Sequence, residues 1–436
     1  MGEITATAYP LLKRLEHTMK HTTIALFICL IMRHAPTTVA AEPAPQIVLS
    51  DTFRRSKAPE TGRLVVQLTS GEGSTYPLYF YIPTITRDGK YLVYHRAARG
   101  EVQLHRLNLA TGKTRQLTFA TCPDTQWRPW CVDSGRGVLD HRSVLNIVRG
   151  LVVYFDGNDV RTVDVETCED KHQFTLPENR EAYGQNCTTP DGKWLIYIHT
   201  PRGSTWGKPC KGAAVVAYNF DTGEQTTLCR IDSAIFHVTA YDNEHFIVTH
   251  PAEHEGMMMT DMTSGRIVPL RDGDLGARGH PIHCQVTSRG IAYEVPGFQL
   301  SGLYDPLARR RFEFPFPEHF EYIHTGRDPE GRLWFYENSS DWDKFDVHDM
   351  YALVRLDREE GDQWLRLTGT WPTYGGGQKA HFHPQLTPDR RWIMFTGGDP
   401  ETRTSHIFLL DVSDLKESQG ISSQLLSPSG ENDIIR

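Results

Sequence analysis

One pattern of polar and apolar positions recurs along the chain: a polar turn is followed by a short strand rich in β-branched and aromatic residues. It reads "TRDGKYLVYH", "IVRGLVVYF", "TPDGKWLIYI", "YDNEHFIVTH", "TSRGIAYEV", "DPEGRLWFYE" and "TPDRRWIMFT". Most of the turns hold Gly, Asn or Asp, as in Asp88-Gly89 and Asp242-Asn243, and these residues supply the positive φ of tight hairpins. Successive copies lie about 40 to 60 residues apart, which is the range of propeller blades.

A second hairpin follows several of these strands, as in "LHRLNLATGKTRQLT" and "AVVAYNFDTGEQTTL". Two hairpins make a four-stranded blade that buries both faces only against its neighbours, so the blades must close into a ring. The sequence therefore predicts an all-β fold, a seven-bladed β-propeller of four-stranded antiparallel blades over residues 51–414. No amphipathic helix of useful length appears, and a pair of β-sandwiches is the alternative that the regular period disfavours. The Ser- and Gly-rich residues 415–436 are expected to form a flexible tail.

The segment Met19–Ala41 has the features of a secretory signal. Its apolar run "TTIALFICLIM" is too short to span a bilayer, and small residues stand where a signal peptidase cleaves. We predict that residues 1–41 are a mis-assigned start plus a signal peptide, that 42–50 are a linker, and that the protein is exported to the periplasm or the medium. A buried N-terminal helix is the alternative. No later segment approaches the length of a membrane span.

Composition narrows the class of partner. With 39 % apolar and 23 % charged residues, the chain is typical of a soluble globular protein. A formal net charge of -8 argues against nucleic acid, but a local cationic pocket or a metal can still attract an acidic ligand. Export would permit disulfides. Local pairing is open to Cys122 with Cys131, Cys168 with Cys187 and Cys210 with Cys229, leaving Cys284.

Histidines gather just before several turn signals, where the innermost strand of each blade should lie. His381 and His383 would project from one face of a strand, and neutral imidazole is the commonest metal ligand. Gln378 can add an amide oxygen from the glycine-rich entry "GGGQ", and His324 can complete the set from the preceding blade. Nitrogen and oxygen donors without thiolate suit Mn, Zn, Fe or Ni better than Ca. The alternative is that each histidine is an ordinary hydrogen-bonded strand residue.

The chain resembles the oligogalacturonate lyase family, polysaccharide lyase family 22, over most of its length from "YFYIPTITRDGKYLVY" to "HIFLLDV". The likeness is strongest in "QKAHFHPQLTPD", where the family's metal-binding glutamine and histidines correspond to Gln378, His381 and His383, with His324 as the fourth ligand. The resemblance implies a seven-bladed propeller with a metal on its axis. It also implies that His280 is the catalytic base. We expect the metal to be a divalent cation, with manganese as the first choice before Zn, Fe and Ni.

Such a site would perform β-elimination on uronate-containing glycans. A cation on the uronate carboxylate offsets the charge that develops when the C5 proton leaves, a histidine removes that proton, and a 4,5-unsaturated product results. The family's assisting arginine has no counterpart in "EHEGMMMTDM", so Arg278 is our substitute. Candidate substrate contacts are the inner-strand His237, the family-like pair His250 and His254 in "THPAEHE", and the aromatic Tyr293.

Departures from the family concern the substrate more than the reaction. The family is cytoplasmic and acts on short oligomers, whereas this chain carries an export signal, so another acidic oligosaccharide or polysaccharide, such as an ulvan-like chain, is a second option. A non-catalytic exported propeller that binds a glycan or a protein is the alternative function. A hydrolase would need two converging carboxylates. The acidic run 341–349 is more simply a solvated loop.

Overall fold

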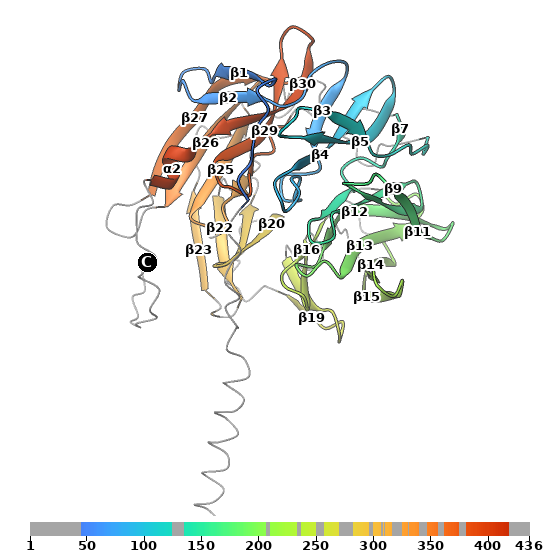
Figure 1. Cartoon of the computed structure of the whole chain (residues 1–436). Helices are drawn as coiled ribbons and strands as arrows, with labels where there is room; N and C mark the ends of the chain where they lie inside the picture. Colours follow the sequence, from blue (N-terminus) through green and yellow to red (C-terminus); the bar gives the residue numbers. More distant parts are fainter. Residues whose placement is uncertain are drawn as a thin grey trace, which may run out of the picture. The chain divides into compact units, whose positions relative to one another are not determined.

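The structure is a computed structural model, shown in Figure 1. It describes residues 45–123, 135–205, 210–232, 237–249, 257–269, 282–295, 300–306, 308, 310–315, 325–329, 331–339, 347–355, 362–374 and 381–417. The predicted signal peptide and most of the predicted tail therefore lie outside the described residues. Within these ranges, no helix is long and apolar enough to cross a membrane.

The described chain is almost entirely β-strand. The first half holds β1 (Arg54–Lys57), β2 (Leu64–Gln67), β3 (Ser74–Pro77), β4 (Tyr91–Ala98), β5 (Glu101–Asn108), β6 (Thr114–Gln116), β7 (Arg136–Gly137), β8 (Val144–Asn146), β9 (Leu151–Asp156), β10 (Asp159–Asp164), β11 (Asp170–Thr175), β12 (Arg180–Thr188), β13 (Trp194–Pro201), β14 (Ala213–Asn219) and β15 (Gln225–Ile231). The second half holds β16 (His237–Ala240), β17 (His245–Thr249), β18 (Met257–Asp261), β19 (Ile267–Pro269), β20 (Ile282–Thr287), β21 (Gly290–Val295), β22 (Leu300–Asp305), β23 (Arg310–Pro315), β24 (Thr325–Arg327), β25 (Leu333–Ser339), β26 (Val347–Arg355), β27 (Asp362–Pro372), β28 (Gln385–Leu386), β29 (Trp392–Asp399), β30 (Thr404–Asp411) and the short helix α2 (Ser413–Glu417).

These strands form small antiparallel sheets in the arrangement of a β-propeller. The orders are β3-β4-β5-β6, β11-β10-β9-β8, β20-β21-β22-β23 and β24-β25-β26-β27, with an eight-stranded sheet from β12 to β19 and a five-stranded sheet β1-β2-β30-β29-β28. The eight-stranded sheet is two four-stranded meanders joined by one parallel bridge, Gln185 to His237. Divided there, the strands make seven groups. The all-β propeller class is thus confirmed.

The two ends of the propeller chain meet in one sheet. Strand β2 pairs antiparallel with β30, with Val65 opposite Leu410 and Gln67 opposite Phe408. The first strands of successive groups also lie side by side, as β8 with β12, β16 with β20 and β24 with β28. These contacts bring the innermost strands of the whole chain to one central region (Figure 1).

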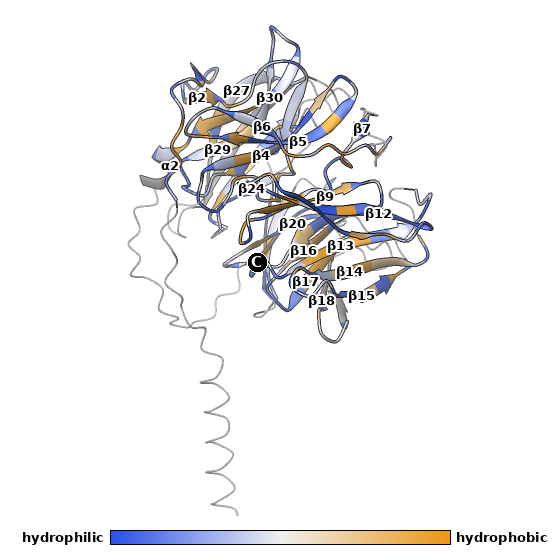
Figure 2. Cartoon of the chain, turned by 45° about the vertical axis from the view of Figure 1, so that its right-hand side comes forward, coloured by the Kyte–Doolittle hydropathy of each residue, from blue (hydrophilic) through white to orange (hydrophobic). Residues whose placement is uncertain are grey.

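The apolar residues are buried between sheets. In Figure 2 the most apolar residues, coloured orange on the ribbon, lie along the strands. One cluster joins residues of β4 and β5 to residues of β9 and β10, and another joins residues of β13 and β14 to β16 and β17. The sheet of β8 to β11, for example, has one face covered by β4 and β5 and the other by β13 and β14, as the predicted ring requires.

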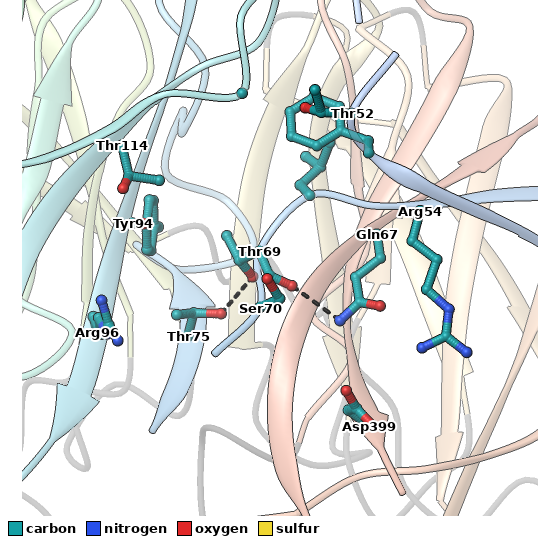
Figure 3. A pocket seen from close by; sticks show the side chains of 13 residues that line it. Thr52, Arg54, Gln67, Thr69, Ser70, Thr75, Tyr94, Arg96, Thr114 and Asp399 are labelled. Atoms are coloured by element: carbon teal, nitrogen blue, oxygen red, sulfur yellow. Dashed lines mark hydrogen bonds between the residues drawn. The ribbon is translucent and has the colours of Figure 1, made fainter. Parts of the chain in front are cut away.

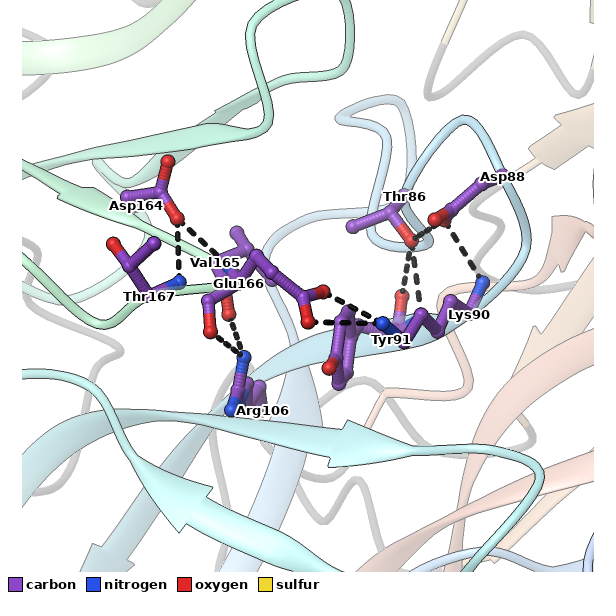
Figure 4. Close-up of polar contacts among 9 residues, drawn as sticks. All are labelled: Thr86, Asp88, Lys90, Tyr91, Arg106, Asp164, Val165, Glu166 and Thr167. Carbon is purple, nitrogen blue, oxygen red and sulfur yellow. Dashed lines mark hydrogen bonds and ion pairs between the residues drawn. The ribbon is translucent and has the colours of Figure 1, made fainter.

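The repeated turn has a hydrogen-bond reason. In the first copy, the Thr86 hydroxyl donates to Asp88 Oδ1 at 2.6 Å and accepts the backbone N–H of Tyr91 at 3.0 Å, while the N–H of Lys90 donates to Asp88 Oδ1 at 3.0 Å (Figure 4). The same bonds recur at Thr189 with Asp191 and at Thr387 with Asp389. The Thr-x-Asp motif thus closes the turn with its own side chains.

Positive φ is found where most of the turn pairs predict it. The residues are Gly89, Gly150, Gly192, Gly290, Gly331 and Arg390. The prediction was wrong for the pair Asp242-Asn243, since neither residue has positive φ. There the Asp242 carboxylate instead accepts the N–H groups of Glu244 and His245 at 2.7 Å.

Residues of one sheet contact the outer hairpin turn of the sheet that follows it in the sequence. Lys90 donates to the Glu166 carboxylate at 2.8 Å, and Arg106 donates to the carbonyls of Val165 and Glu166 (Figure 4). Arg149 reaches Asp221 of the following sheet in the same way, at 2.7 Å. These exposed ion pairs set the neighbour contact but contribute little stability.

Four of the described cysteines bear on the predicted local disulfides. Cys168, Cys187, Cys210 and Cys229 are free thiols. The local pairs Cys168 with Cys187 and Cys210 with Cys229 are therefore not formed, while Cys131 lies outside the described residues. Burial raises the pKa of Cys187 to about 12, which makes its thiol unreactive at neutral pH.

One prediction concerns the outer turns, in which Gly112, Gly223 and Gly265 share a positive φ with Cys168. A Cβ at Gly223 would meet no described heavy atom within 4 Å, so Gly223→Ala should cost about 1 kcal/mol of unfolding free energy through backbone strain alone. Cys168→Gly should remove the same strain and stabilise by less than that, because the Cys168 side chain also packs on a core cluster. Urea unfolding of both variants measures this, and an unchanged Gly223→Ala variant would contradict it.

Candidate functional site

The centre of the propeller is filled by an aromatic segment from between β3 and β4. The Tyr79 ring lies 5.1 Å from His383, 5.6 Å from His141 and 6.1 Å from His237, measured between ring centroids. These histidines come from three separate segments, one before β8, one at the start of β16 and one before β28, and all are buried. The fold therefore brings imidazoles from distant parts of the chain to one place.

The neighbouring residue Phe80 extends this cluster. Its ring lies 4.9 Å from His283 and 5.6 Å from His383. His283 in turn lies 5.6 Å from His237, whose Nδ1 is 3.2 Å from the hydroxyl of Thr249. We call the histidines 141, 237, 283 and 383 the axial histidines.

Three axial histidines occupy one position of the repeat. Each lies four residues before the residue at which the turn begins: His237 before Tyr241, His283 before Thr287 and His383 before Thr387. In the sequence, His324 stands four residues before Asp328, which begins the corresponding turn. The predicted metal ligand His324 thus shares the repeat position of these histidines, although it lies outside the described residues.

A buried carboxylate holds the segment that contains His381 and His383. Glu337 on β25 accepts the Nδ1–H of His381 at 2.8 Å through one oxygen and the backbone N–H of His383 at 3.1 Å through the other. The two imidazole rings are stacked, with centroids 5.4 Å apart and planes within 16°. None of the three residues is more than 1 % exposed.

These residues fit a divalent metal by the chemistry of their donors. Donation from His381 Nδ1 to a carboxylate leaves the ring's lone pair on Nε2, as in many metal-bound histidines. The described residues alone contain no group of three potential ligands placed to share an ion. The expected set needs His324 and Gln378, and both lie outside the described residues.

A second buried carboxylate lies in the neighbouring sheet. Glu294 on β21 accepts the Nδ1–H of His283 at 2.8 Å and the backbone N–H of Thr325 at 2.9 Å. Arg327 lies 3.5 Å from the same carboxylate and stacks over Trp334, 4.3 Å from the ring centre. Burial lowers the pKa of Arg327, but a guanidinium remains protonated at any working pH, so it keeps Glu294 next to a positive charge.

A third polar group lies beside the axial histidines, on β3 and β4. The hydroxyl of Tyr76 donates to Asp140 at 2.9 Å, and its ring stacks on His95 at 5.1 Å. The Nδ1 atoms of His95 and His141 lie 3.4 Å and 3.1 Å from the carbonyls of residues 77 and 78. Burial lowers the pKa of His95 to about 4, partly opposed by Asp140, so this imidazole is neutral near pH 7.

The structure places only some of the predicted site residues. His237, His381 and His383 belong to the central cluster. Tyr293 does not join it: its hydroxyl donates to Glu313 on the outermost strand β23 at 3.0 Å, and its ring lies over Gly302 within its own sheet. Six predicted residues lie outside the described residues and remain predictions: Arg278, His280, His250, His254, His324 and Gln378.

Sequence reasoning missed both buried glutamates, His95 and the central role of His283. The signal was present, since Glu294, Glu337 and His95 each follow the tyrosine of a repeated strand in "AYEV", "FYEN" and "VYHR". That position lies on the second strand of its sheet, and an ionisable residue buried there needs a polar partner.

A separate cavity of about 460 Å³ lies between the sheet of β2 and β30 and the sheet of β3 to β6 (Figure 3). Figure 3 shows Thr69 at its centre, with its hydroxyl 2.6 Å from that of Thr75 and its carbonyl accepting from Gln67 at 3.0 Å. Its walls also include Arg54, Arg96 and Asp399. None of the predicted site residues lines it.

Solved structures share this fold. The chain matches an oligogalacturonate lyase from Vibrio parahaemolyticus with a TM-score of 0.66 and 18 % identity, covering 85 % of this chain and 99 % of that one. It matches an oligogalacturonate lyase in complex with manganese with a TM-score of 0.65 and 20 % identity, covering 86 % and 99 %. No protein-family model and no curated protein sequence matches the chain. At this identity the likeness establishes the propeller fold.

The buried imidazole of His95 predicts a pH dependence of stability. Its pKa is about 4 in the folded protein and about 6.5 when unfolded, so the folded state resists protonation. Unfolding free energy should be unaffected by His95 above pH 6.5 and should fall by about 3 kcal/mol as the pH drops to 4. His95→Asn, which keeps a donor for the carbonyl of residue 77, should lose this part of the pH dependence in thermal melts.

The exposed His172 supplies the control for that experiment, since His172→Asn should leave the pH profile as it is in the unmodified protein. Parallel loss of stability between pH 6.5 and 4 in the unmodified protein and in His95→Asn would contradict the assignment.

Proposed function

We propose that this protein is a metal-dependent lyase that cleaves uronate-containing oligosaccharides by β-elimination. The observation that carries the proposal is the buried group of His381, His383 and Glu337, in which His383 is also one of the axial histidines. The shared fold with oligogalacturonate lyases, one of them in complex with manganese, supports the same reaction class. The finer assignments, oligogalacturonate as substrate, manganese as metal and export by the N-terminal segment, are part of this proposal.

His381 and His383, with His324 and Gln378, would hold the metal. When bound, a divalent cation there would offset the second negative charge that develops on the uronate carboxylate as the C5 proton leaves. The remaining steps need a base for that proton and donors that orient the sugar. We assign sugar contacts to His237, and to His250, His254 and Arg278 from the sequence.

The base is a histidine of the stretch "GHPIHC", which holds His280 and His283. His283 has the geometry for the role, because its Nδ1–H donates to Glu294 and the lone pair is then on Nε2. In the elimination, this nitrogen takes the C5 proton, the C5–H electron pair forms the C4–C5 double bond, and the glycosidic oxygen leaves C4 with its electron pair. His280 is the alternative base.

The metal assignment predicts that His381→Ala and His383→Ala each abolish stoichiometric binding of a transition metal. The reason is that a metal site of four donors loses most of its affinity for the ion when one imidazole is removed. Metal content after dialysis against Mn²⁺ measures this, and His172→Ala is the matched control because that side chain is exposed. A full metal complement in both His381→Ala and His383→Ala would contradict the assignment. An unmodified protein without metal would favour a propeller that only binds a partner.

The base assignment predicts that His283→Ala lowers kcat by about 10² to 10⁴ while leaving metal content unchanged. The measurement is the rise in ultraviolet absorbance of the unsaturated product over a panel of uronate oligomers and polymers, with metal supplied. His280→Ala is tested beside it. If only His280→Ala loses turnover, the proton goes to His280, and if no uronate glycan gives an absorbance rise, the lyase proposal is wrong.

A further inference from the structure

Glu294 and Glu337 occupy equivalent positions in adjacent sheets. Each follows a tyrosine on the second strand of its sheet, and each is at most 2 % exposed. Each accepts one imidazole Nδ1–H at 2.8 Å and one backbone N–H from the next sheet, that of Thr325 or His383, at 2.9 Å or 3.1 Å. The two carboxylates differ in their other contacts. Glu337 holds His381, whereas Glu294 holds His283, accepts the hydroxyl of Thr325 as well, and lies 3.5 Å from Arg327.

The bonds of Glu337 fix two features of the metal site at once. Donation from His381 Nδ1 selects the tautomer whose lone pair is on Nε2 and sets the plane of the ring. The other oxygen holds the backbone of His383, which has a φ of 46° and would relax from this left-handed conformation without a partner. One carboxylate thus orients both imidazoles.

A purely structural role for Glu337 would not need this geometry. Burying an ionised carboxylate is costly unless all its acceptor positions face donors, and an apolar residue would fill the same space more stably. Two donors that Glu337 meets belong to His381 and His383, which the proposed function assigns to the metal. Glu294 meets neither of them, and Arg327 beside it offsets part of its burial cost.

We propose that Glu337 is a positioning residue that sets the metal affinity of the site by orienting His381 and His383. The inference rests on the proposed function, because it takes these histidines as metal ligands. Glu294 holds His283 instead, so its loss should leave metal affinity intact. This pair provides a matched comparison within one protein.

The test compares Glu337→Gln with Glu294→Gln in the full-length chain. A glutamine has one amide oxygen and one N–H₂ group, so in either orientation it faces one of the two donors with another donor. After chelation, Mn²⁺ affinity is measured by competition with a metal-sensitive dye. We expect Glu337→Gln to bind about 10- to 100-fold more weakly than the unmodified protein, and Glu294→Gln to bind within about twofold of it.

A second readout does not need the metal. In ¹⁵N-histidine NMR spectra of the chelated protein, the unmodified chain should show His381 protonated at Nδ1, and Glu337→Gln should shift that resonance toward a mixture of tautomers. Equal Mn²⁺ affinity in the unmodified protein and Glu337→Gln, or equal losses in both glutamine variants, would overturn the inference. Failure of the unmodified protein to bind Mn²⁺ would instead reject the proposed function.

Should Glu337→Gln fail to fold by circular dichroism, Glu337→Asp decides the matter. The shorter carboxylate keeps the charge but reaches only one of the two donors, so an affinity between those of the unmodified protein and a His381→Ala variant is expected. Affinity equal to that of the unmodified protein would overturn the inference.

Discussion

The structure depends on one constraint: the described sheets bury apolar residues against one another, and a sheet that is apolar on both faces can be covered only by two neighbours. The core clusters accordingly lie between sheets, and the pairing of β2 with β30 joins the beginning and the end of the propeller chain. Because the ring is closed in this way, the first strands of all groups converge. The axial histidines meet for that reason and not because they are near one another in sequence.

Where the strands converge, polar side chains at the centre are buried away from water. Side chains there lose contact with water, and an ionised group without donors would cost several kcal/mol. The chain meets this with imidazoles, which can be buried neutral, and with two carboxylates whose oxygens face N–H donors. Glu294 accepts from its own sheet and from the next one, and Glu337 accepts from the segment that precedes β28. The same arrangement that makes burial tolerable also fixes tautomers, and fixed tautomers are what a metal ligand or a general base requires.

Much of the fold could be predicted because its signals are local. The Thr-x-Asp turn carries its own hydrogen bonds within six residues, and the strand that follows alternates in a readable way. The site was only partly readable. His381 and His383 lie two residues apart in sequence, but their partner Glu337 lies in another sheet, and no local pattern reports a contact over 44 residues. Tyr293 was wrongly expected at the centre. It precedes Glu294 on a pleated strand, where neighbouring side chains project to opposite faces, and its hydroxyl contacts the outermost strand.

Backbone conformation gives an independent reason to treat the centre as functional. In the turns of the described chain, positive φ is mostly given to glycine, which adopts it without strain. At the centre, His141, His283 and His383 adopt positive φ of 54°, 54° and 46° although glycine would avoid the cost. A strained residue persists only where its surroundings hold it, as Glu337 holds the backbone of His383. The cost of this backbone conformation at His383 accords with the role as a metal ligand that is proposed above for its imidazole.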